Sequence, residues 1–569
     1  MIKNIIVNLL SKTSIVVNSG VTHVHLEHPS DMTHGDYSTN IALVLSKSAG
    51  VSPREIAENL KQEIEKDLPK EIERVEVAGA GFLNFFLSKD FLNHSINTIL
   101  KEGKDFGKGE SFQGKKVLVE YTDPNPFKVF HIGHLMQNAI GESLTRLAEF
   151  AGADVKRLCY QGDVGLHVAK TIWGMIQARV AFPQDGDSLT DKIKFMGNAY
   201  VVGNLAYTDD PKAKEEIKEI NKKVYERSDP EINIYYDKGK KWSLEHFEEI
   251  YKKLGTKFDE YFFESEMAGP GKELVLEFLK KGIFKESDGA IIFPGEEHGL
   301  HTRVFINSEG LPTYEAKDLG LFFAKSNRYE YDLSVYTTAS EQSDYFKVLF
   351  SAIGMIDKSF KEKAVHVPHG LLRFSDGKMS SRKGNIISGE DLIKDMEVKA
   401  MDKMGEREMD ESLKREVSEI VAVSAIKYSI LKQSPGKDIV FDPEKSLSFE
   451  GDSGPYLLYA LVRTNSILRK AKEAGLTGEK FEEGNYKLQK MLYRFPEIVE
   501  RAWLEKSPQL VADFLQEVAH EFSAFYANEK IVDTDDLKNS QSKVALTRAF
   551  REVLKTGLFL LGIKEVERM

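Results

Sequence analysis

The sequence predicts an α/β protein built around a doubly wound parallel sheet, with a smaller α+β domain before it and an all-α bundle after it. A strand pattern at 117–120 (VLVE) leads through a loop into a long helical pattern at 134–152 (HLMQNAIGESLTRLAEFAG), and a second strand pattern, VKRLCY, follows. This alternation is typical of Rossmann-like parallel sheets. After Glu390 strand signals almost vanish and apolar residues recur at helical spacing, which predicts the bundle.

Length and composition agree with a multidomain enzyme. A chain of 569 residues has room for three or four domains of about 150 residues each. The 41% apolar and 29% charged residues exclude a disordered or collagen-like chain. The formal net charge is −11, so no basic field covers the whole molecule and any nucleic acid must be held by local patches.

Cysteine content and the absence of long apolar runs bear on location. Cys159 is the single cysteine, so the chain forms no internal disulfide and no cysteine-rich zinc site. We interpret it as a small core residue without a chemical role. The apolar stretch at 5–10 is interrupted by Asn8 and lacks a small-residue cleavage site, and no later apolar run approaches the roughly 18 residues of a membrane span. We therefore expect a cytoplasmic protein without membrane attachment.

The domain order follows from a glycine-rich joint and from changes of helical and strand pattern along the chain. Residues 53–68 carry a helical pattern, and β-rich pieces end in VEVAGAGFLNFFLS, which together predict an α+β domain over 1–112. The glycine-rich joint at 103–114 separates it from a catalytic domain over 113–388. Densely charged helical patterns predict a helical insertion at about 187–285, whose charged part we interpret as solvated surface. Residues 389–569 then form the bundle.

Two apparent motifs carry no function. Residues 109–116 (GESFQGKK) fit a phosphate-loop frame, but Lys116 stands where Ser or Thr is needed and the segment precedes a strand. His298 and His301 lie near two glutamates without a helical pattern or further ligands. We predict a linker, a polar loop and no protein-held metal ion.

The strongest signal is PNPFKVFHIGH at 124–134, between the first strand of the sheet and its first long helix. A helix start after a parallel strand presents free N–H groups and positive dipole to phosphate. Gly133 lets a ligand approach the backbone, while His131 and His134 can donate to phosphoryl oxygens. His-x-Gly-His alone is a weak signal, but KMSSRKGN at 378–385 follows the strand pattern VHVPHGLLRF in a Gly/Ser-rich loop.

Together these segments resemble the HIGH and KMSKS signatures of class I aminoacyl-tRNA synthetases. The resemblance implies ATP binding with Mg²⁺ bridging the phosphates. Ser381 replaces the lysine that is usual at the fourth KMSKS position, and Lys128, three residues before the first histidine, takes the place that a substituting lysine occupies in many arginyl enzymes. The implied catalytic residues are His131, His134, Lys128 and Lys378, and the implied ATP-binding residues are Asn125, His131, Gly133, His134, Lys378, Met379, Ser380 and Ser381.

The residues that would bind the amino acid favour a guanidinium substrate. Such a cation needs carboxylates in bidentate geometry with hydrogen-bonding neighbours. Tyr314 and Asp318 are four residues apart on a predicted helix, so they face the same side. This set resembles the arginyl-tRNA synthetase family, whose matching residues hold the ammonium, carboxylate and guanidinium groups of arginine: Glu120, Asn125, Tyr314, Asp318 and Gln342.

The resemblance extends over almost the whole chain. HGDYSTNIAL and AGAGFLNFFL resemble the family's N-terminal domain, which touches the tRNA elbow, and residues 449–470 and 560–569 resemble its anticodon-binding domain. Tyr456, Tyr459 and Arg463 recur on one helix face, with Tyr526 in a later helix, and aromatic rings with arginine can stack on anticodon bases. A core stripe fits the same periodicity. Nearby Arg469 and Lys470 favour RNA by adding local charge.

The implied reaction is activation of arginine with ATP and transfer to tRNA(Arg), with tRNA bound before activation. The implied partners are tRNA(Arg), arginine and ATP, and we expect a monomer. Glutamyl and class I lysyl synthetases share both signatures and remain alternatives. A small nucleotidyltransferase fused to RNA-binding modules is a third possibility, disfavoured by the long helical region, and an inactive tRNA-binding factor is a fourth, disfavoured by the intact His131, Gly133, His134 and Lys378.

Overall fold

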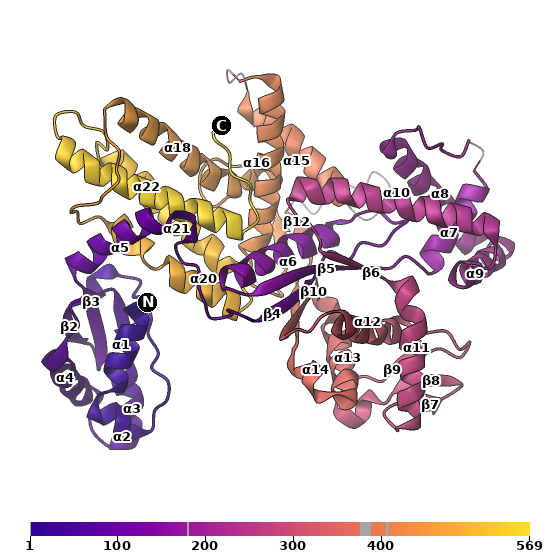
Figure 1. Cartoon of the computed structure of the whole chain (residues 1–569), viewed down its shortest axis with the longest axis horizontal. Coiled ribbons are helices and arrows are strands. Elements are labelled where there is room, and N and C mark those ends of the chain that lie inside the picture. Colours follow the sequence, from indigo (N-terminus) through magenta and orange to yellow (C-terminus); the bar gives the residue numbers. More distant parts are fainter. Residues whose placement is uncertain (1, 179–180, 376–387, 406–408) are drawn as a thin grey trace.

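The computed structural model describes the whole chain except residues 1, 179–180, 376–387 and 406–408. Its centre is a five-stranded parallel sheet in the order β11–β10–β4–β5–β6 (Figure 1). The predicted doubly wound parallel sheet is therefore confirmed. The strands are β4 (Lys116–Glu120), β5 (Asp154–Gln161), β6 (Glu260–Phe263), β10 (Leu333–Ala339) and β11 (Ala364–His369).

The strand order places a switch point beside β4. The chain runs outward from β4 through β5 to β6, and then returns to the other side of β4 for β10 and β11. Loops leave β4 and β10 in opposite directions, which opens a crevice at the carboxyl ends of these two strands. Any ligand-binding site of the sheet is expected there.

Alternating side chains of β4 explain how helices cover both faces of the sheet. Val117 and Val119 are buried in the large core that contains helix α6 (Ile132–Phe150), whereas Leu118 is buried in a separate core with Met267 and Leu321. The latter two residues come from α11 (Glu264–Lys280) and α12 (Tyr314–Arg328). Each strand face thus has its own helical layer, as the period of two requires.

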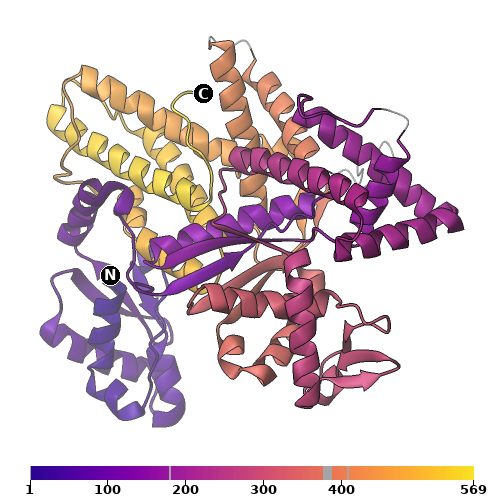
Figure 2. The same cartoon turned by 45° about the vertical axis from the view of Figure 1, so that its right-hand side comes forward.

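The helical insertion lies between β5 and β6. It consists of α7 (Leu166–Ile176), α8 (Leu189–Asp209), α9 (Pro211–Glu226) and α10 (Pro230–Leu254), and it has its own apolar core. Side chains of Ser188, Asp210 and Asp229 cap the last three helices at their starts. In Figures 1 and 2 the insertion and the N-terminal domain lie at opposite ends of the sheet.

The range expected for the insertion, 187–285, also contains an element of the main sheet. Residues Glu260–Phe263 form β6, which pairs in parallel with β5. Four residues between charged neighbours are too short a pattern to stand out from the surrounding helices. The β-like patterns AIIF and RVFI form a separate antiparallel sheet of β7 (Lys285–Ser287), β8 (Ala290–Phe293) and β9 (Arg303–Ile306), inserted before α12.

Between the last strands, α13 (Ser343–Ile356) and α14 (Lys358–Glu362) connect β10 to β11. A short strand, β12 (Leu372–Phe374), then pairs with β13 (Ile439–Phe441), which is the one described strand beyond residue 388. The rest of the C-terminal region is helical, as expected: α15 (Gly389–Met404), α16 (Glu411–Leu431), α17 (Pro443–Ser446), α18 (Gly454–Glu473), α19 (Lys487–Leu492), α20 (Phe495–Leu504), α21 (Gln509–Asn528) and α22 (Leu537–Leu560).

The N-terminal region is a small α+β unit. Its antiparallel sheet has the order β1–β3–β2, from β1 (Tyr37–Thr39), β2 (Ile72–Ala78) and β3 (Phe82–Leu87). Its buried core runs from Ile2 to Leu92 and includes Tyr493 from the bundle. The boundaries at 112 and 388 remain predictions. The helices are α1 (Ile2–Ser11), α2 (Ser14–Ser19), α3 (Ile41–Ala49), α4 (Pro53–Ile64) and α5 (Lys89–Glu102).

Within the described part of the chain, no helix combines the length and the apolar composition needed to cross a membrane.

Candidate active site

Polar side chains gather where all five strands of the sheet end. Glu120 is the last residue of β4, Gln161 of β5 and His369 of β11, while Glu264 follows β6 directly. Gln342 ends the short 3₁₀ turn Ser340–Gln342 that follows β10. The carboxyl ends of parallel strands meet at one edge, so these residues surround the crevice beside β4.

The tip of α6 carries both histidines of the HIGH segment. His131 is the N-cap residue of α6, and its Nδ1 accepts a hydrogen bond from the Gly133 amide at 3.1 Å. His134 Nδ1 accepts from the His131 amide at 3.2 Å, and the two rings stack with centroids 3.5 Å apart. Since both Nδ1 atoms accept, each neutral ring carries its proton on Nε2, where it can be donated to a ligand.

Both rings are neutral at physiological pH. Burial, with the charges of Lys128 and His369 nearby, lowers the pKa of His131 to about 4. Burial and the neighbouring His131 and Lys128 lower the pKa of His134 well below its ordinary value. A Cβ atom on Gly133 would lie 2.9 Å from Cε1 of His131, so this glycine makes room for the His131 ring. Its role in letting the ligand approach the backbone stays a prediction.

The loop between β4 and α6 has a strained backbone held by specific contacts. Thr122, Asp123 and Phe127 have φ angles of 80°, 44° and 66°, which non-glycine residues rarely adopt. Asp123 Oδ1 accepts from the Tyr160 amide at 2.7 Å, and Asn125 Oδ1 accepts from the Gly162 amide at 3.1 Å. Backbone strain of this kind is concentrated at functional sites, where surrounding contacts maintain it.

Lys128 lies in this loop, between Asn125 and the tip of α6. Its side chain is exposed, yet enough protein surrounds the ammonium group to lower its pKa, with Glu264 acting in the opposite direction and Lys170 in the same one. The lowered His131 pKa shows that Lys128 and His131 sense each other's charge. Lys128 is therefore near the α6 tip, as the sequence predicts.

Asp318 lies on α12, near the acids at the carboxyl ends of strands β4 and β6. Its Oδ2 accepts a hydrogen bond from the Tyr345 hydroxyl group. Burial and the negative charges of Glu120, Glu264 and Glu315 raise the pKa of Asp318 to about 8, although the hydrogen bond from Tyr345 acts in the opposite direction. The predicted pair Glu120 and Asp318, 198 residues apart in the numbering, is therefore close enough in space to interact.

Two buried lysines in this region were missed by the sequence analysis. Lys325 Nζ donates to Glu120 Oε2 at 2.8 Å and to the Tyr336 hydroxyl at 2.9 Å, and Lys317 Nζ donates to Glu264 Oε2 at 2.7 Å. Lys325 follows Asp318 by seven residues, two helical turns, so its place on the same face of α12 was a readable signal. Glu120, one of the predicted arginine ligands, already has a cationic partner.

The remaining predicted arginine ligands are more open to solvent. Tyr314, at the start of α12, has an exposed fraction of 64%. Its ring lies 5.2 Å from Lys317 Nζ, and partial burial and the nearby Glu264 raise its pKa. Gln342 is exposed at the N-cap of α13. Lys378, Met379, Ser380 and Ser381 lie outside the described residues.

The predicted anticodon residues separate into a surface cluster and a core residue. Arg463 donates to the Tyr459 hydroxyl at 2.7 Å, and its guanidinium lies 4.6 Å from the Tyr459 ring and 4.9 Å from the Tyr526 ring. Tyr526 is 44% exposed. Tyr456 instead is buried, with its hydroxyl bonded to Ser523 and the Ala519 carbonyl of α21. It belongs to the packing between α18 and α21 and is not available for stacking.

The residues at the α6 tip fit a polyphosphate. Neutral imidazole N–H donors, the start of a helix and the ammonium of Lys128 are groups that bind phosphoryl oxygens. In the described ranges, no three histidine, cysteine or acidic side chains are arranged to hold a metal ion. Mg²⁺ is commonly bound through substrate phosphates together with one or two carboxylates.

Comparisons with known proteins agree with this geometry. Three family models match: the catalytic domain of tRNA synthetases class I (R) over 95–443, the DALR anticodon binding domain over 457–569 and the arginyl tRNA synthetase N terminal domain over 1–87. The chain belongs to the arginyl-tRNA synthetase family. Among curated relatives of this family, the arginine–tRNA ligase of Treponema denticola is 32% identical over 96% of this chain and 95% of its own length.

A second arginine–tRNA ligase, from Clostridium botulinum, is also 32% identical and covers 96% of both chains. Among solved structures, the arginyl-tRNA synthetase of Thermus thermophilus matches with a TM-score of 0.82 and 24% identity over the full length of both chains. At that identity the structural match bears on the fold alone. The arginyl-tRNA synthetase family fold predicted from the sequence is confirmed.

Proposed function

We propose that this protein is an arginine–tRNA ligase, which activates arginine with ATP to arginyl-adenylate and pyrophosphate and then transfers arginine to the 3′ end of tRNA(Arg). Membership of the arginyl-tRNA synthetase family over nearly the whole chain supports the overall reaction. One feature of the site supports arginine as the amino acid that is bound. Asp318 is a carboxyl group without a lysine partner among the described contacts, near the acids Glu120 and Glu264.

In the proposed complex, Asp318 binds the guanidinium group of arginine. Ionised Asp318 offers two oxygens to the fork of guanidinium donors, and the tyrosine hydroxyl of Tyr345 fixes its orientation. Glu120, held by Lys325, borders the same crevice and adds to its negative potential. We assign Asn125, Tyr314 and Gln342 to the α-amino and carboxylate end of the substrate. These roles explain why an uncharged amino acid would leave Asp318 unpaired.

The ATP phosphates are proposed to lie at the α6 tip. The arginine carboxylate attacks the α-phosphorus in line with departing pyrophosphate, so the protein has to position both reactants and balance developing charge. Nε2–H groups of His131 and His134 donate to the α-phosphoryl oxygens, and Lys128 stabilises the leaving pyrophosphate. Lys378 to Ser381 complete this set as a prediction from sequence. Mg²⁺ bound together with ATP would supply further charge neutralisation at the phosphates.

We assign tRNA binding to the bundle and the N-terminal domain. Tyr459, Arg463 and Tyr526 present rings and a guanidinium group together, an arrangement suited to unstacked anticodon bases. Because the catalytic domain and the proposed tRNA-binding units lie in one chain, we expect a monomer, which light scattering with size-exclusion chromatography can test. A buried, unbridged Cys159 agrees with the expected cytoplasmic location.

Amino-acid-dependent exchange of pyrophosphate into ATP tests the proposal. The purified protein is assayed with each of the twenty amino acids, with and without tRNA, and charging of tRNA(Arg) is measured in parallel. We expect exchange and charging with arginine. Exchange with glutamate or lysine would assign the chain to one of the alternative synthetases, and no exchange with any amino acid would leave a tRNA-binding factor.

A further inference from the structure

Two helices that belong to different units end at the same place. Helix α10 of the insertion ends at Leu254, and α22 of the bundle ends at Leu560. The last carbonyl groups of a helix lack partners within the helix and lie at the negative end of its dipole. Such ends attract cations, and here two basic side chains serve both ends together.

Each of the two basic side chains joins the same pair of helix ends. Lys427 Nζ, from α16, donates to the Leu254 carbonyl at 2.6 Å and to the Gly562 carbonyl at 2.7 Å. Arg146, from α6, donates to the carbonyls of Gly255 at 3.0 Å and Phe559 at 2.8 Å. The bundle and the helix that begins with His131 thus hold the end of α10 between them.

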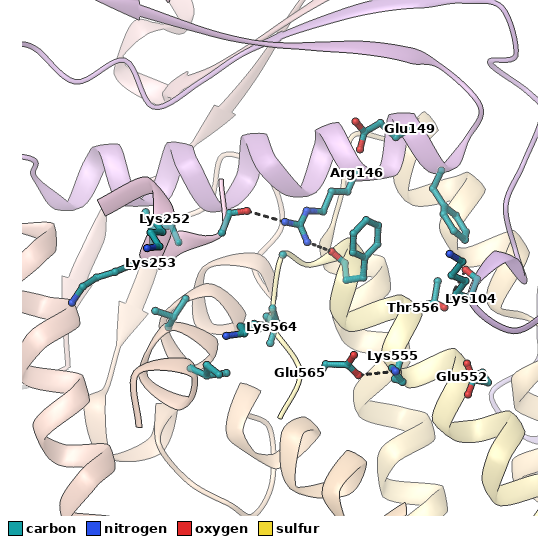
Figure 3. Close-up of a pocket in the computed structure, with 18 of the residues that line it drawn as sticks. Lys104, Arg146, Glu149, Lys252, Lys253, Glu552, Lys555, Thr556, Lys564 and Glu565 are labelled. Atoms are coloured by element: carbon teal, nitrogen blue, oxygen red, sulfur yellow. Dashed lines mark hydrogen bonds and ion pairs between the residues drawn. The ribbon is translucent and has the colours of Figure 1, made fainter. Parts of the chain in front are cut away.

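The fit around Lys427 is tight, whereas the space beside the junction is open. Lys427 is fully buried, and a Cβ atom on Gly562 would lie 2.9 Å from its Nζ atom. Gly562 has φ +68°, which favours glycine. A cavity of about 790 Å³ adjoins the junction, and Figure 3 shows Arg146 crossing one side of it between the two carbonyl groups. Tyr251 and Leu254 of α10 also pack in the large apolar core, and the four hydrogen bonds of Lys427 and Arg146 fix where the helix ends.

The middle of α10 lies on the loop that leads to the HIGH segment. Ser243 Oγ accepts a hydrogen bond from the Phe127 amide at 3.0 Å. A Cβ atom on Gly239 would lie 2.1 Å from Cε1 of Phe127, so the aromatic ring rests directly on the helix. Phe127 is one of the left-handed residues of this loop, and it stands between Asn125 and Lys128.

We propose that α10 is a positioning element through which the placement of the anticodon-binding bundle sets the geometry of the ATP-binding loop. Its positioning residues are Lys427, which holds the carboxyl end of α10, and Ser243, near the middle of the helix. They act about 16 Å apart along the helix, at 1.5 Å per residue. The proposal rests on the proposed function, because Asn125 and Lys128 are the loop residues assigned to substrate. It gives a role to the charged insertion, for which the sequence indicated none.

Hydrogen exchange detected by mass spectrometry tests, without any substrate, whether the contact at the end of α10 holds the loop at 124–130 in place. Lys427→Met removes both bonds to the helix ends and keeps the side-chain length. We expect amide exchange in peptides covering 124–130 to become faster by about tenfold, as a locally opened contact allows. Lys432→Met is the matched control, because Lys432 follows the same helix and pairs with Asp452 inside the bundle. It should leave that exchange unchanged.

Steady-state kinetics with a double variant test the link to the reaction. Lys427→Met and Ser243→Ala should each lower kcat for arginine activation by about tenfold, as small misplacements of reacting groups do. KM for arginine should change by a smaller factor than kcat, because Asp318 comes from α12 and, of the proposed arginine ligands, Asn125 is the one in this loop. The double variant should also lose only about tenfold, whereas independent sites this far apart would together lose about a hundredfold.

The outcomes separate this proposal from the proposed function. Unchanged exchange at 124–130 in Lys427→Met, or losses in kcat that multiply in the double variant, would overturn the positioning role. If the unaltered protein does not activate arginine, the proposed function fails, and the exchange experiment alone decides whether α10 transmits position. Should Lys427→Met not fold, Arg146→Lys weakens the parallel bridge, because Arg146 reaches the Phe559 and Gly255 carbonyls through two separate nitrogens and lysine offers one. The same two readouts apply.

Discussion

At the scale of single residues, the active-site crevice is defined by which carboxyl groups already have a cation. Glu120 pairs with Lys325, Glu264 with Lys317 and Asp163 with Lys240. Asp318 has only the Tyr345 hydroxyl among its described partners. Under the proposed function, an entering guanidinium group supplies the positive charge that Asp318 lacks among the described residues.

We predict that arginine binding depends on pH through Asp318. Its pKa, raised to about 8 by burial and nearby acids, means that the free protein holds a proton there at neutral pH. Binding the arginine cation requires loss of this proton, so kcat/KM for arginine should rise by up to about tenfold per pH unit towards pH 8 and then level off. The rise should be absent in Asp318→Asn, which should also raise KM for arginine far more than KM for ATP.

The same proton affects stability in the opposite direction. Between pH 3.8 and about 8 the folded carboxyl group keeps a proton that the unfolded one has lost, so this contribution to the free energy of unfolding falls as pH rises. Saturating arginine should reduce that fall, because it stabilises the ionised form. An Asp318→Asn variant whose arginine KM equals that of the unaltered protein would contradict the assigned role.

The buried pair of Lys325 and Glu120 gives a prediction about stability. Lys325 is fully buried and Glu120 is 6% exposed. Lys325→Met leaves the carboxylate without its cation, so we expect the free energy of unfolding to fall by about 3–5 kcal/mol in denaturant titrations. Adding Glu120→Gln should recover much of this loss. If the single and double variants are equally stable, the pair does not contribute as an ion pair.

The residues of the candidate site could be predicted from the sequence where they belong to a motif or recur at helical spacing. The histidines of the HIGH segment and the acids Glu120 and Asp318 were all predicted. The structure brings Glu120 and Asp318 within reach of each other's charge and places His131 near Lys128. Lys317 and Lys325 escaped because a lysine on a helix is usually solvated, and only the three-dimensional arrangement shows that each faces a buried acid.

At the scale of elements, the α6 start and the bundle helices followed from apolar periodicity, whereas β6 did not. Its four residues lie between α10 and α11, and their strand character depends on pairing with β5. The tertiary context therefore decides this element. Tyr456 shows a similar limit: spacing places it on the face of Tyr459 and Arg463, but α21 covers that part of α18.

The cluster of Tyr459, Arg463 and Tyr526 leads to a prediction for tRNA binding. Arg463→Ala removes the guanidinium group that lies between the two rings. We expect the Kd for tRNA(Arg) to rise by about tenfold, of the order of one stacking contact, while the KM values for ATP and arginine stay unchanged. Filter binding at fixed salt measures this effect. Lys472→Ala, an exposed change on the same helix, is the control, and an equal effect of both variants would argue for charge alone.

At the scale of the whole molecule, the N-terminal domain meets the bundle at α5, which packs on α19 and α22, and at a polar and aromatic contact around Glu497. Glu497 of α20 accepts a hydrogen bond from the Tyr37 hydroxyl, and its Oε2 lies 3.5 Å from His28 Nε2. Burial opposes ionisation of Glu497, but the hydrogen bonds from His28 and Tyr37 lower its pKa below the ordinary value. The ionised group therefore stabilises the contact.

We expect Glu497→Gln to loosen this attachment. Hydrogen bonds to charged groups contribute about 1.5–3 kcal/mol, so the variant should open the joint at 103–114 to proteolysis more often. Lowering the pH through the depressed pKa of Glu497 should have the same effect in the unaltered protein and little effect in the variant. Limited proteolysis with an acid-active protease, from pH 7 down to about pH 3, measures both. Equal cleavage rates across this range would contradict the assignment.

The order of the units along the chain was predictable from composition and punctuation, but their contacts with each other were not. The joint at 103–114 and the loss of strand signals after Glu390 are local features of the sequence. Arg146 and Lys427 hydrogen-bond to backbone carbonyl groups at the ends of α10 and α22, and any residue could supply such a carbonyl. Backbone acceptors leave no trace in side-chain patterns, so contacts of this type become visible only in three dimensions.

Tyr493 shows what contacts between domains mean for work with fragments of the protein. Although it lies in the bundle, its ring packs in the apolar interior of the first domain, against Phe91 and Tyr37. A recombinant fragment that stops at residue 87 would lack this ring and expose the surface that receives it. Exchange of the N-terminal domain between relatives would thus succeed best when the segment that contains Tyr493 and Glu497 is exchanged with it.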